Sequence, residues 1–439
     1  MPTALAYALG VLILIVGIGL SVALHELGHM LPAKRFGVKV PEYFIGFGPH
    51  LWSTTRGGTE YGVKAIWLGG YCRLLGMIPP APPGRVDKPG SLIAQAREES
   101  LAELAPDEQD RAFYRLTVPR KLAVMAGGIL TNLALGVILL AVALGVVGQP
   151  AYTSTVASVA SCVSSDVDAG KACTSSDPAS PASAAGLRVG DEIVSWNGTA
   201  TSTWTEVQDA IVAGGTVPAT VVVERDGEDL TLTVTAVEVE RTVYTDSGDV
   251  KKDADGRTVT GKRPYVGIGP ELGTQRSSAG QIAGDVTTAV GQTLGAIVTI
   301  PSGLYHAVAA GLGLEERSSQ GLISLVGMGR IAGEVTSAGT GSGGGTIPFS
   351  ARLFSMLSLL GSLNLALFAF NLVPLLPLDG GHIAGALWEG ARRRIARLRG
   401  RPDPGYVDVA RMLPVGQVVL VLLISMTVVL VWVDLVAPV

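Results

Sequence analysis

The chain has 439 residues, of which 48% are hydrophobic and only 16% are charged. This balance is too apolar for an ordinary soluble domain and indicates a membrane protein. The formal net charge of -4 shows no basic excess, so we exclude nucleic-acid-binding proteins as a class.

Four stretches without Asp, Glu, Lys or Arg are long enough to cross the roughly 30 Å of a bilayer's hydrocarbon core as helices. They are Ala4 to Leu24, Leu122 to Val147, Leu353 to Leu378, and Met412 to Val433. The first is too long for the apolar region of a cleaved signal peptide, and its first basic residue, Lys34, comes after it. We therefore expect about four transmembrane helices.

Basic residues beside the span ends predict the orientation, because short cytoplasmic loops retain Lys and Arg. They follow the first span (residues 34–39), precede the second (111–121) and follow the third (392–401). Residues 148–165, 331–351 and the tail after Val433 contain neither Lys nor Arg. Both termini should lie outside the cell, with 31–121 and 392–411 in the cytoplasm.

Between the first two spans, residues 43–75 alternate apolar residues with Gly and Thr and contain glycine turn signals, a pattern typical of β-hairpins. Residues 79–110 are Pro-rich and then charged, which predicts a solvated cytoplasmic loop. Cys72 has no partner on this side and should be a buried or free thiol.

The long section after the second span predicts a small α/β domain. Strands are expected over 157–161, 219–225 and 230–239, and a helix over 203–213. Cys162 and Cys173 lie in this extracytoplasmic section, where oxidising conditions would permit a disulfide, and the sequence leaves that pairing open.

Residues 286–314 carry no formal charge, so a fifth span is one interpretation. Their Thr, Ser and Gln content favours the alternative, an amphipathic or interfacial helix pair. A fifth span would also invert the third and place Asp379 on the opposite membrane face from His25. The Gly-rich stretch 340–345 is expected to be a flexible linker into the third span.

A metal-binding motif occurs at the end of the first span. The chain has only five histidines, and two of them form His25-Glu26-Leu27-Gly28-His29. On a helix, residues i and i+4 share a face, so both imidazoles can bind one Zn²⁺ with Glu26 beside a metal-bound water. The alternative, histidines that cap a helix end or meet lipid headgroups, leaves the ionisable Glu26 at membrane depth without a partner.

A catalytic zinc needs a third protein ligand, and the end of the third span supplies Asp379. Pro374 and Pro377 should break the helix before it, and Gly380-Gly381 keep the backbone free beside it. The alternative role for Asp379 is an N-cap on a helix over residues 383–398.

Together these motifs resemble the site-2 proteases, which perform regulated intramembrane proteolysis. The resemblance rests on His25-Glu26-x-x-His29, on Leu378-Asp379-Gly380, and on a PDZ-like domain that carries Ala185-Gly186-Leu187, Gly190-Asp191 and Asn197-Gly198. It implies one Zn²⁺ held by His25, His29 and Asp379, with Glu26 as general base and acid.

The resemblance also implies how substrate is held. Asn364 and Asn371 would contact substrate, although an interhelical hydrogen bond is the alternative for each. Residues 43–75 resemble the family's membrane-associated β-loop, in which Gly69, Gly70 and Tyr71 would pair with extended substrate, unless the loop is purely structural. Where the family has Gly-Pro before an Asn in the second span, this chain has Gly127-Gly128-Ile129 before Asn132.

The expected protein is thus a membrane α-helical protease of the bacterial cell membrane with a cytoplasmic-side β-loop, an extracytoplasmic PDZ domain and an active site near the cytoplasmic face. Its partners would be the bilayer, a single-span substrate such as an anti-sigma factor, and a peptide C-terminus at the PDZ domain. An inactive scaffold and an ion transporter are the rival interpretations; the complete motif opposes the first, and the lack of an internal repeat opposes the second. The first, second, third and fourth transmembrane helices are expected within 1–40, 122–148, 352–400 and 401–439. The β-hairpin and cytoplasmic loop are expected at 41–121, the PDZ-like domain at 149–245, and an extracytoplasmic linker with amphipathic helices at 246–351.

Overall fold

A computed structural model of the chain describes residues 3–82, 84–102, 104–163, 173–174, 176–243, 252–253, 257–318, 321–338 and 347–438, with only the backbone of residue 68. The chain forms two compact units. The helical unit comprises Met1–Val146, Ser277–Thr346 and Arg352–Val439, and the sheet unit comprises Val147–Arg276 and Ile347–Ala351. The linker expected at 340–345 lies outside the described residues.

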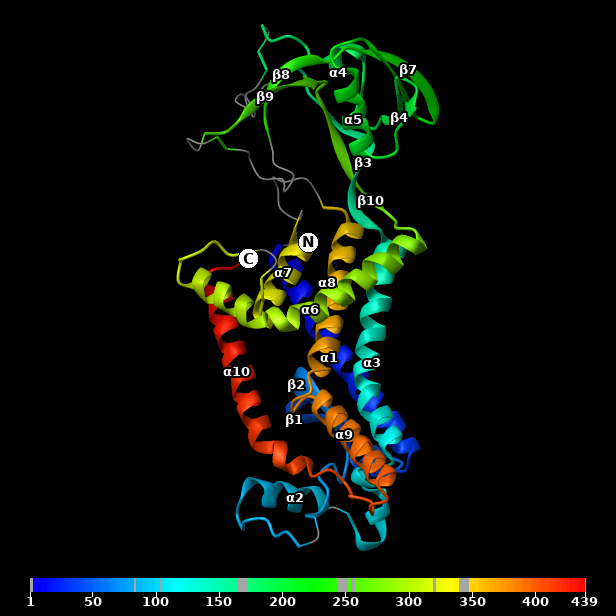
Figure 1. Ribbon diagram of the computed structural model, residues 1–439. Helices are drawn as coiled ribbons and strands as arrows, with labels where there is room; N and C mark the ends of the chain where they lie inside the picture. Colours follow the sequence, from blue (N-terminus) through cyan, green and yellow to red (C-terminus); the bar gives the residue numbers. More distant parts are fainter. Residues whose placement is uncertain are drawn as a thin grey trace. The chain divides into compact units, whose positions relative to one another are not determined.

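Five helices within the described part of the chain are long and apolar enough to cross a membrane. They are α1 (Thr3–Arg35), α3 (Val118–Val142, continued by a π-helical turn to Val147), α6 (Ala279–Gly311), α8 (Phe349–Asn371) and α10 (Leu413–Val436) (Figure 1). Exposed side chains such as Leu12, Leu130 and Val421 are apolar, as expected where lipid replaces water. The four predicted stretches are confirmed as helical, except that residues 372–378 are irregular.

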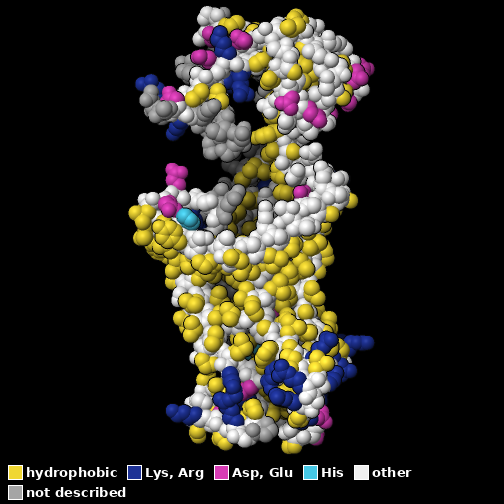
Figure 2. Space-filling view, in the orientation of Figure 1, with side chains coloured by type: hydrophobic (Ala, Val, Ile, Leu, Met, Phe, Trp, Pro, Cys, Tyr) yellow, Lys and Arg dark blue, Asp and Glu magenta, His cyan; other side chains and the backbone are white. Residues whose placement is uncertain are grey.

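One end of the helical unit gathers most of its basic residues, and we call it the basic end. Figure 2 shows Lys and Arg collected there below a broad hydrophobic belt. Lys121 at the start of α3 pairs with Glu389 of α9 (Asp379–Leu398) at 2.8 Å, with both side chains buried. Arg97 of α2 (Leu92–Ala102) pairs with Asp408, just before α10, at 3.0 Å. These ion pairs join α9 to the start of α3 and α2 to the segment just before α10.

The segment between residues 79 and 110 is more ordered than the predicted solvated loop. It contains α2 and a 3-10 turn, Pro106–Arg111, and a second turn follows at Phe113–Arg115. Arg97 is buried between Asp87 and Asp408. A charge pattern does not reveal which of its charges will be paired, so the sequence did not predict the helix or the buried Arg97; the solvated cytoplasmic character of the segment stays a prediction.

The predicted β-hairpins are confirmed as one curled hairpin of β1 (Glu42–Arg56) and β2 (Thr59–Arg73). Residues 42–45 pair on one side with residues 60–63 and on the other with residues 70–73, so the two strands fold back on themselves. Gly46, with φ of +88°, makes the bend, and a Cβ there would lie 2.7 Å from the Ile66 carbonyl oxygen.

The pair of helices expected over 286–314 is instead the single helix α6, which continues through Pro301 and is followed by α7 (Leu325–Ser337). Its first turns contact Gly145 beyond the end of α3, and Gly311 at its other end contacts Trp432 and Val433 near the end of α10. Both contacts lie away from the basic end. Accordingly, α6 runs across α3 and α10 rather than alongside them (Figure 1).

The sheet unit is built on a sheet of strand order β10-β3-β4-β6-β7, with β5 paired to β4, and a separate ribbon of β8 and β9. The strands are β3 (Gln149–Val159), β4 (Glu192–Trp196), β5 (Thr199–Ala200), β6 (Ala219–Arg225), β7 (Glu228–Val234), β8 (Val237–Thr242), β9 (Thr260–Tyr265) and β10 (Ile268–Gln275). Helices α4 (Pro181–Ala185) and α5 (Trp204–Gly214) complete it, and α5 begins with a capping box of Thr203 and Glu206.

Two expectations for the sheet unit change. The unit continues through β9 and β10 to Arg276, so the boundary predicted at residue 245 is too early. β10 pairs with β3, more than a hundred residues earlier, and local patterns do not report such a pairing. The disulfide left open by the sequence is formed between Cys162 and Cys173.

A buried ion pair supports this sheet. Asp191 is fully buried and accepts two hydrogen bonds from the Arg225 guanidinium, at 2.7 and 2.8 Å, and one from the Arg188 backbone N–H. Burial alone would raise the pKa of Asp191, but these hydrogen bonds outweigh it and hold the pKa below its usual value.

Replacing Arg225 with Met should destabilise the sheet unit by about 3 kcal/mol, because it leaves a buried carboxylate without its cation. The wild-type contribution is present above the unfolded-state pKa of about 3.9 and is lost as pH falls through the lower folded-state pKa. Hydrogen exchange of β4 and β6 in the full-length protein measures both effects. Glu224→Gln, at an exposed neighbouring position, is the control; equal exchange in R225M and wild type would contradict the prediction.

Candidate metal centre

Three side chains from two separate helices meet inside the helical unit. His25 Nε2 lies 3.2 Å from His29 Nε2, and Asp379 Oδ2 lies 3.3 Å from the first and 3.2 Å from the second. A tetrahedral zinc with ligands at 2.0–2.1 Å requires ligand atoms about 3.3 Å apart. The three atoms therefore form one face of a tetrahedron of the right size and leave the fourth vertex for water or substrate.

The second nitrogen of each imidazole is also held. His29 Nδ1 lies 2.8 Å from the Val124 carbonyl oxygen, so it carries the proton and leaves Nε2 for a metal. His25 Nδ1 lies 3.0 Å from the side-chain amide of Asn132, which is buried on α3. Both partners belong to α3, so this helix orients both imidazoles.

The Asn132 amide gives an independent test of whether a metal fits. Its Oδ1 atom is buried without a hydrogen-bond partner while Nδ2 faces His25 Nδ1. If His25 Nε2 binds a metal, the neutral ring has its proton on Nδ1 and needs an acceptor. Turning the amide by half a turn brings Oδ1 to face this N–H, which satisfies both groups.

Glycines allow α1 and α3 to come this close. A Cβ on Gly28 would lie 2.5 Å from the Gly127 carbonyl oxygen, and one on Gly128 would lie 2.2 Å from His29 Nε2. Small residues at such a crossing let helix backbones touch. In Gly127-Gly128, which departs from the family's Gly-Pro, the first glycine thus allows backbone contact and the second makes room for the His29 ring.

Asp379 is placed by the loop that follows α8. Helix α9 begins at Asp379 itself, after an N-cap residue, Leu378, that makes no side-chain capping bond. The N-cap alternative for Asp379 is therefore not seen, and the helix starts earlier than the predicted residue 383. A Cβ on Gly380 would lie 2.3 Å from the Val373 carbonyl oxygen, so this glycine is required for the loop to fold back on α9.

Glu26 lies between the histidines and strand β2. Its carboxylate is close enough to His25, His29 and Asp379 for electrostatic interaction, and it accepts a hydrogen bond from the Cys72 backbone. Burial and this carboxylate raise the pKa of the Cys72 thiol to about 12, so the free thiol stays neutral.

The predicted substrate residues of the hairpin, Gly69, Gly70 and Tyr71, lie just before Cys72. Gly70 and Tyr71 pair with Ile45 and Phe44 on one edge of β2. A Cβ on Gly69 would overlap the Phe47 ring, at 2.3 Å, so part of the glycine requirement is packing. The Tyr71 hydroxyl donates to Glu42 at 2.7 Å.

The two asparagines of α8 differ. Asn364 is fully buried and donates to the Ser21 hydroxyl of α1 at 2.9 Å, so it makes the interhelical hydrogen bond and is not exposed to substrate. Asn371 is the last residue of α8 and is partly exposed, and its substrate role stays a prediction.

Sequence reasoning missed the part played by Asn132. Its only signal was a carboxamide in an otherwise nearly apolar span, which marks a polar contact but not the partner. An apolar cavity of about 290 Å³ was also missed; Leu376, Pro377 and His382 line it on one side, and Leu413 and Gly416 of α10 on the other.

Comparison with known proteins places this site in a family context. The model of Peptidase family M50 matches residues 13–413. Zinc metalloprotease Rip1 of Mycobacterium tuberculosis is 36% identical over 99% of this chain and 98% of its own length. Zinc metalloprotease Rip1 of Mycolicibacterium smegmatis is 32% identical over 98% of each chain, and Metalloprotease MmpA of Caulobacter vibrioides is 28% identical over 89% of each.

Asn132→Leu should weaken zinc binding by about 10- to 100-fold, because His25 loses the group that fixes its ring and tautomer. Asn132→Asp, which keeps an acceptor, should bind zinc more tightly than Asn132→Leu. Competition with a chromophoric chelator on detergent-purified protein measures both. Thr131→Val is the control, since the Thr131 hydroxyl donates to the Gly127 carbonyl and not to a histidine; wild-type affinity in N132L would show that α3 does not orient the ring.

Proposed function

The chain belongs to peptidase family M50, and from this we propose that it is a site-2-type zinc metalloprotease that hydrolyses peptide bonds in or near transmembrane segments. The observation that carries the proposal is the tetrahedral face formed by His25, His29 and Asp379. These residues lie within a unit whose exposed surface is largely apolar, so substrate bonds that reach them are bonds in or beside the membrane.

The proposed reaction divides the work between metal and protein. Bound zinc would lower the pKa of a coordinated water and polarise the scissile carbonyl. The Glu26 carboxylate takes the proton from the attacking water and delivers it to the leaving amine nitrogen. Asn132 and the Val124 carbonyl keep both imidazoles in the tautomer that leaves Nε2 as the ligand atom.

The proposed membrane placement has both termini extracytoplasmic and the active site near the cytoplasmic side of a bacterial cell membrane. In support, His25 and His29 occupy the last turns of α1 before Lys34 and Arg35, and Asp379 begins the helix that carries the Arg-rich segment. Lys and Arg are retained on the cytoplasmic side.

Four helices would then cross the bilayer, and α6 would lie at the extracytoplasmic interface. Its two ends contact the ends of α3 and α10 that lie away from the basic end, and a spanning helix would need its ends at opposite faces. Thr287, Thr293 and Thr299 each donate to a carbonyl within the helix, which lowers the cost of hydroxyls at an interface.

Substrate is proposed to bind as an extended strand beside β2. A helical substrate must unwind before its carbonyls can react, and an open strand edge offers it replacement hydrogen bonds. Residues 70–73 pair with β1 on one edge, and at Cys72 the chain reaches Glu26. Asn371 and the 290 Å³ cavity next to the Asp379 loop are the proposed contacts for substrate side chains.

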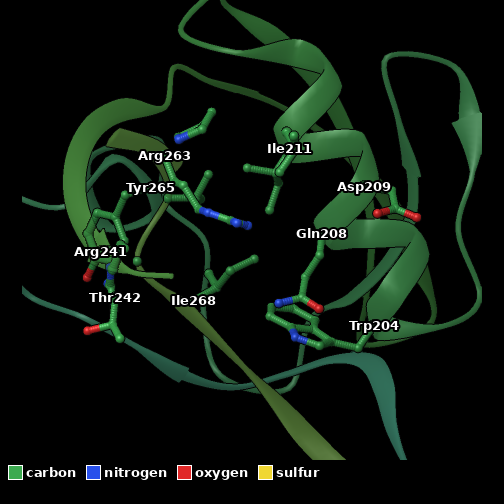
Figure 3. A pocket seen from close by; sticks show the side chains of 13 residues that line it. Trp204, Gln208, Asp209, Ile211, Arg241, Thr242, Arg263, Tyr265 and Ile268 are labelled. Atoms are coloured by element: carbon green, nitrogen blue, oxygen red, sulfur yellow. The ribbon is translucent and has the colours of Figure 1, made fainter. Parts of the chain in front are cut away.

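The sheet unit is proposed to be a PDZ domain that binds a peptide C-terminus. Edge strand β10 follows the loop of Val266 and Gly267, whose carbonyls accept from the Ala182 and Ala160 backbone N–H groups. Because the C=O and N–H of one peptide unit point in opposite directions, the N–H groups of Gly267 and Ile268 point away from those supports. Val266, Gly267 and Ile268 all line one groove. Figure 3 shows this groove, in which the two N–H groups suit a carboxylate.

The proposed biological role is regulated intramembrane proteolysis. The substrate would be a single-span protein, such as an anti-sigma factor, that another protease has already trimmed outside the cell. The sheet unit would bind the new C-terminus or act as a size filter, and the cut inside the membrane would release the cytoplasmic part.

Glu26→Gln should abolish cleavage of a model transmembrane substrate while leaving bound zinc unchanged, because it removes the base but no ligand. Asp379→Ala should lose both cleavage and most zinc, since it removes a ligand. Metal analysis and gel-based cleavage with purified protein in detergent test this. Cleavage by E26Q at the wild-type rate would contradict the protease assignment; full zinc without cleavage by wild type would favour a scaffold or transporter.

The placement of α6 makes a separate prediction. Cysteines introduced at exposed Gly280 and Leu314 should both react with a membrane-impermeant maleimide added to intact cells, whereas Leu398→Cys should react only after permeabilisation. Labelling at only one of positions 280 and 314 would show that α6 crosses the membrane. Wild-type protein treated in the same way is the control, because it shows how much of the labelling comes from the free Cys72.

A further inference from the structure

A groove of about 560 Å³ lies in the sheet unit between α5 and the β8–β9 ribbon. Trp204, Gln208, Ile211 and Val212 line it from one face of α5, and Arg241, Thr242, Arg263 and Tyr265 line it from the ribbon (Figure 3). Its volume is in the range of ligand sites in proteins. The α5 wall is thus mixed, with Gln208 and Asp209 beside apolar side chains, and the ribbon wall is cationic.

The cationic wall follows from the strand register. β8 and β9 pair so that Val239 faces Arg263 and Val237 faces Tyr265. Alternate residues of paired strands share a face, so Arg241, Arg263 and Tyr265 lie on one side of the ribbon. The Arg241 guanidinium lies 4.7 Å from the centre of the Tyr265 ring, a contact that restrains its direction.

The charge of this groove differs from that of the whole chain. Among the described residues that line it are two arginines and one carboxylate, Asp209 of α5, whereas the chain has a formal net charge of -4. Figure 3 places the labelled Asp209 on the α5 side, across from both arginines. Guanidinium groups pair with carboxylates with high directional preference.

We propose that this groove selects peptide C-termini with Asp or Glu among the residues just before the terminus. The inference rests on the proposed role of the sheet unit as a PDZ domain and adds the class of sequence it accepts. The terminal carboxylate would meet the N–H groups of Gly267 and Ile268, and the peptide would extend along the open edge of β10. Side chains on one face of that peptide would then meet Arg241 and Arg263.

The proposed occupant is the trimmed substrate. The first cut would create a C-terminus that did not exist before, so acidic residues exposed by it would identify a substrate that is ready for the second cut. A neutral or basic terminus would make the same backbone contacts without the two charge pairs. Electrostatic complementarity of this kind contributes more to specificity than to raw affinity.

Binding of fluorescent hexapeptides to full-length protein in a non-ionic detergent tests the proposal. A peptide with two Glu before a terminal Val should bind about tenfold more tightly than the same peptide with Gln, since two partly exposed ion pairs contribute about that much. The difference should shrink as salt rises. Amidation of the terminus should weaken both peptides equally.

Variants assign the effect to the groove. Arg241→Gln/Arg263→Gln should remove the preference for Glu over Gln, whereas Lys262→Gln should keep it, because Lys262 belongs to β9 but does not line the groove. The double charge reversal Arg241→Glu/Arg263→Glu should prefer a Lys-containing peptide, a gain that misfolding cannot produce.

Three results would overturn the inference: equal affinity for the Glu and Gln peptides, an unchanged preference in the double Gln variant, or displacement of the Glu peptide by short-chain phosphatidylglycerol at equal concentration. Zinc content should be unaffected in all these variants, because none of the three residues belongs to the metal centre. Failure of this inference is read from peptide binding, whereas failure of the protease assignment is read from zinc content and cleavage by the wild-type protein and E26Q, so the two failures are distinguishable.

Discussion

The structure depends on how an apolar bundle holds several ionisable groups together. His25, Glu26, His29 and Asp379 are costly at membrane depth unless each has a partner. The histidine Nε2 atoms and an Asp379 oxygen lie at the spacing of zinc ligands, and each histidine Nδ1 has a partner on α3. A divalent ion would compensate the carboxylates, so metal binding and packing of α1, α3 and the α8–α9 loop should stabilise one another.

The close crossing of α1 and α3 follows from the same requirement. Gly28 and Gly127 let the two backbones touch, and Gly128 leaves room for the His29 ring. Ion pairs and hydrogen bonds elsewhere then fix the helices that carry the ligands. Asn364 joins α8 to α1 through Ser21, and Lys121 joins α3 to α9 through Glu389, ten residues after Asp379. Both bonds are buried, where a lost partner is expensive, so they limit sliding of the third ligand relative to the other two.

Sequence patterns predicted what depends on neighbouring residues and failed where distant residues meet. The i and i+4 spacing of His25 and His29 predicts a shared face, and the absence of charge predicts the long helices. Nothing local shows that Asn132 would face His25, that Arg97 would be buried against Asp408, or that β10 would pair with β3. The Thr, Ser and Gln content of residues 286–314 favoured a pair of helices, yet α6 continues as one helix through Pro301, because one missing backbone N–H is tolerated when neighbouring elements hold the rest.

An open strand edge is a hazard in most proteins, because its unpaired backbone groups attract other chains. In the proposed mechanism this chain uses two such edges for recognition. In the helical unit, β2 reaches Glu26 at Cys72, so an unwound substrate that pairs there would present its carbonyls beside the metal ligands. In the sheet unit, β10 has β3 on one side and a groove with two arginines near its start. Backbone pairing supplies affinity in both places without regard to sequence, so selectivity must come from the side chains along each edge.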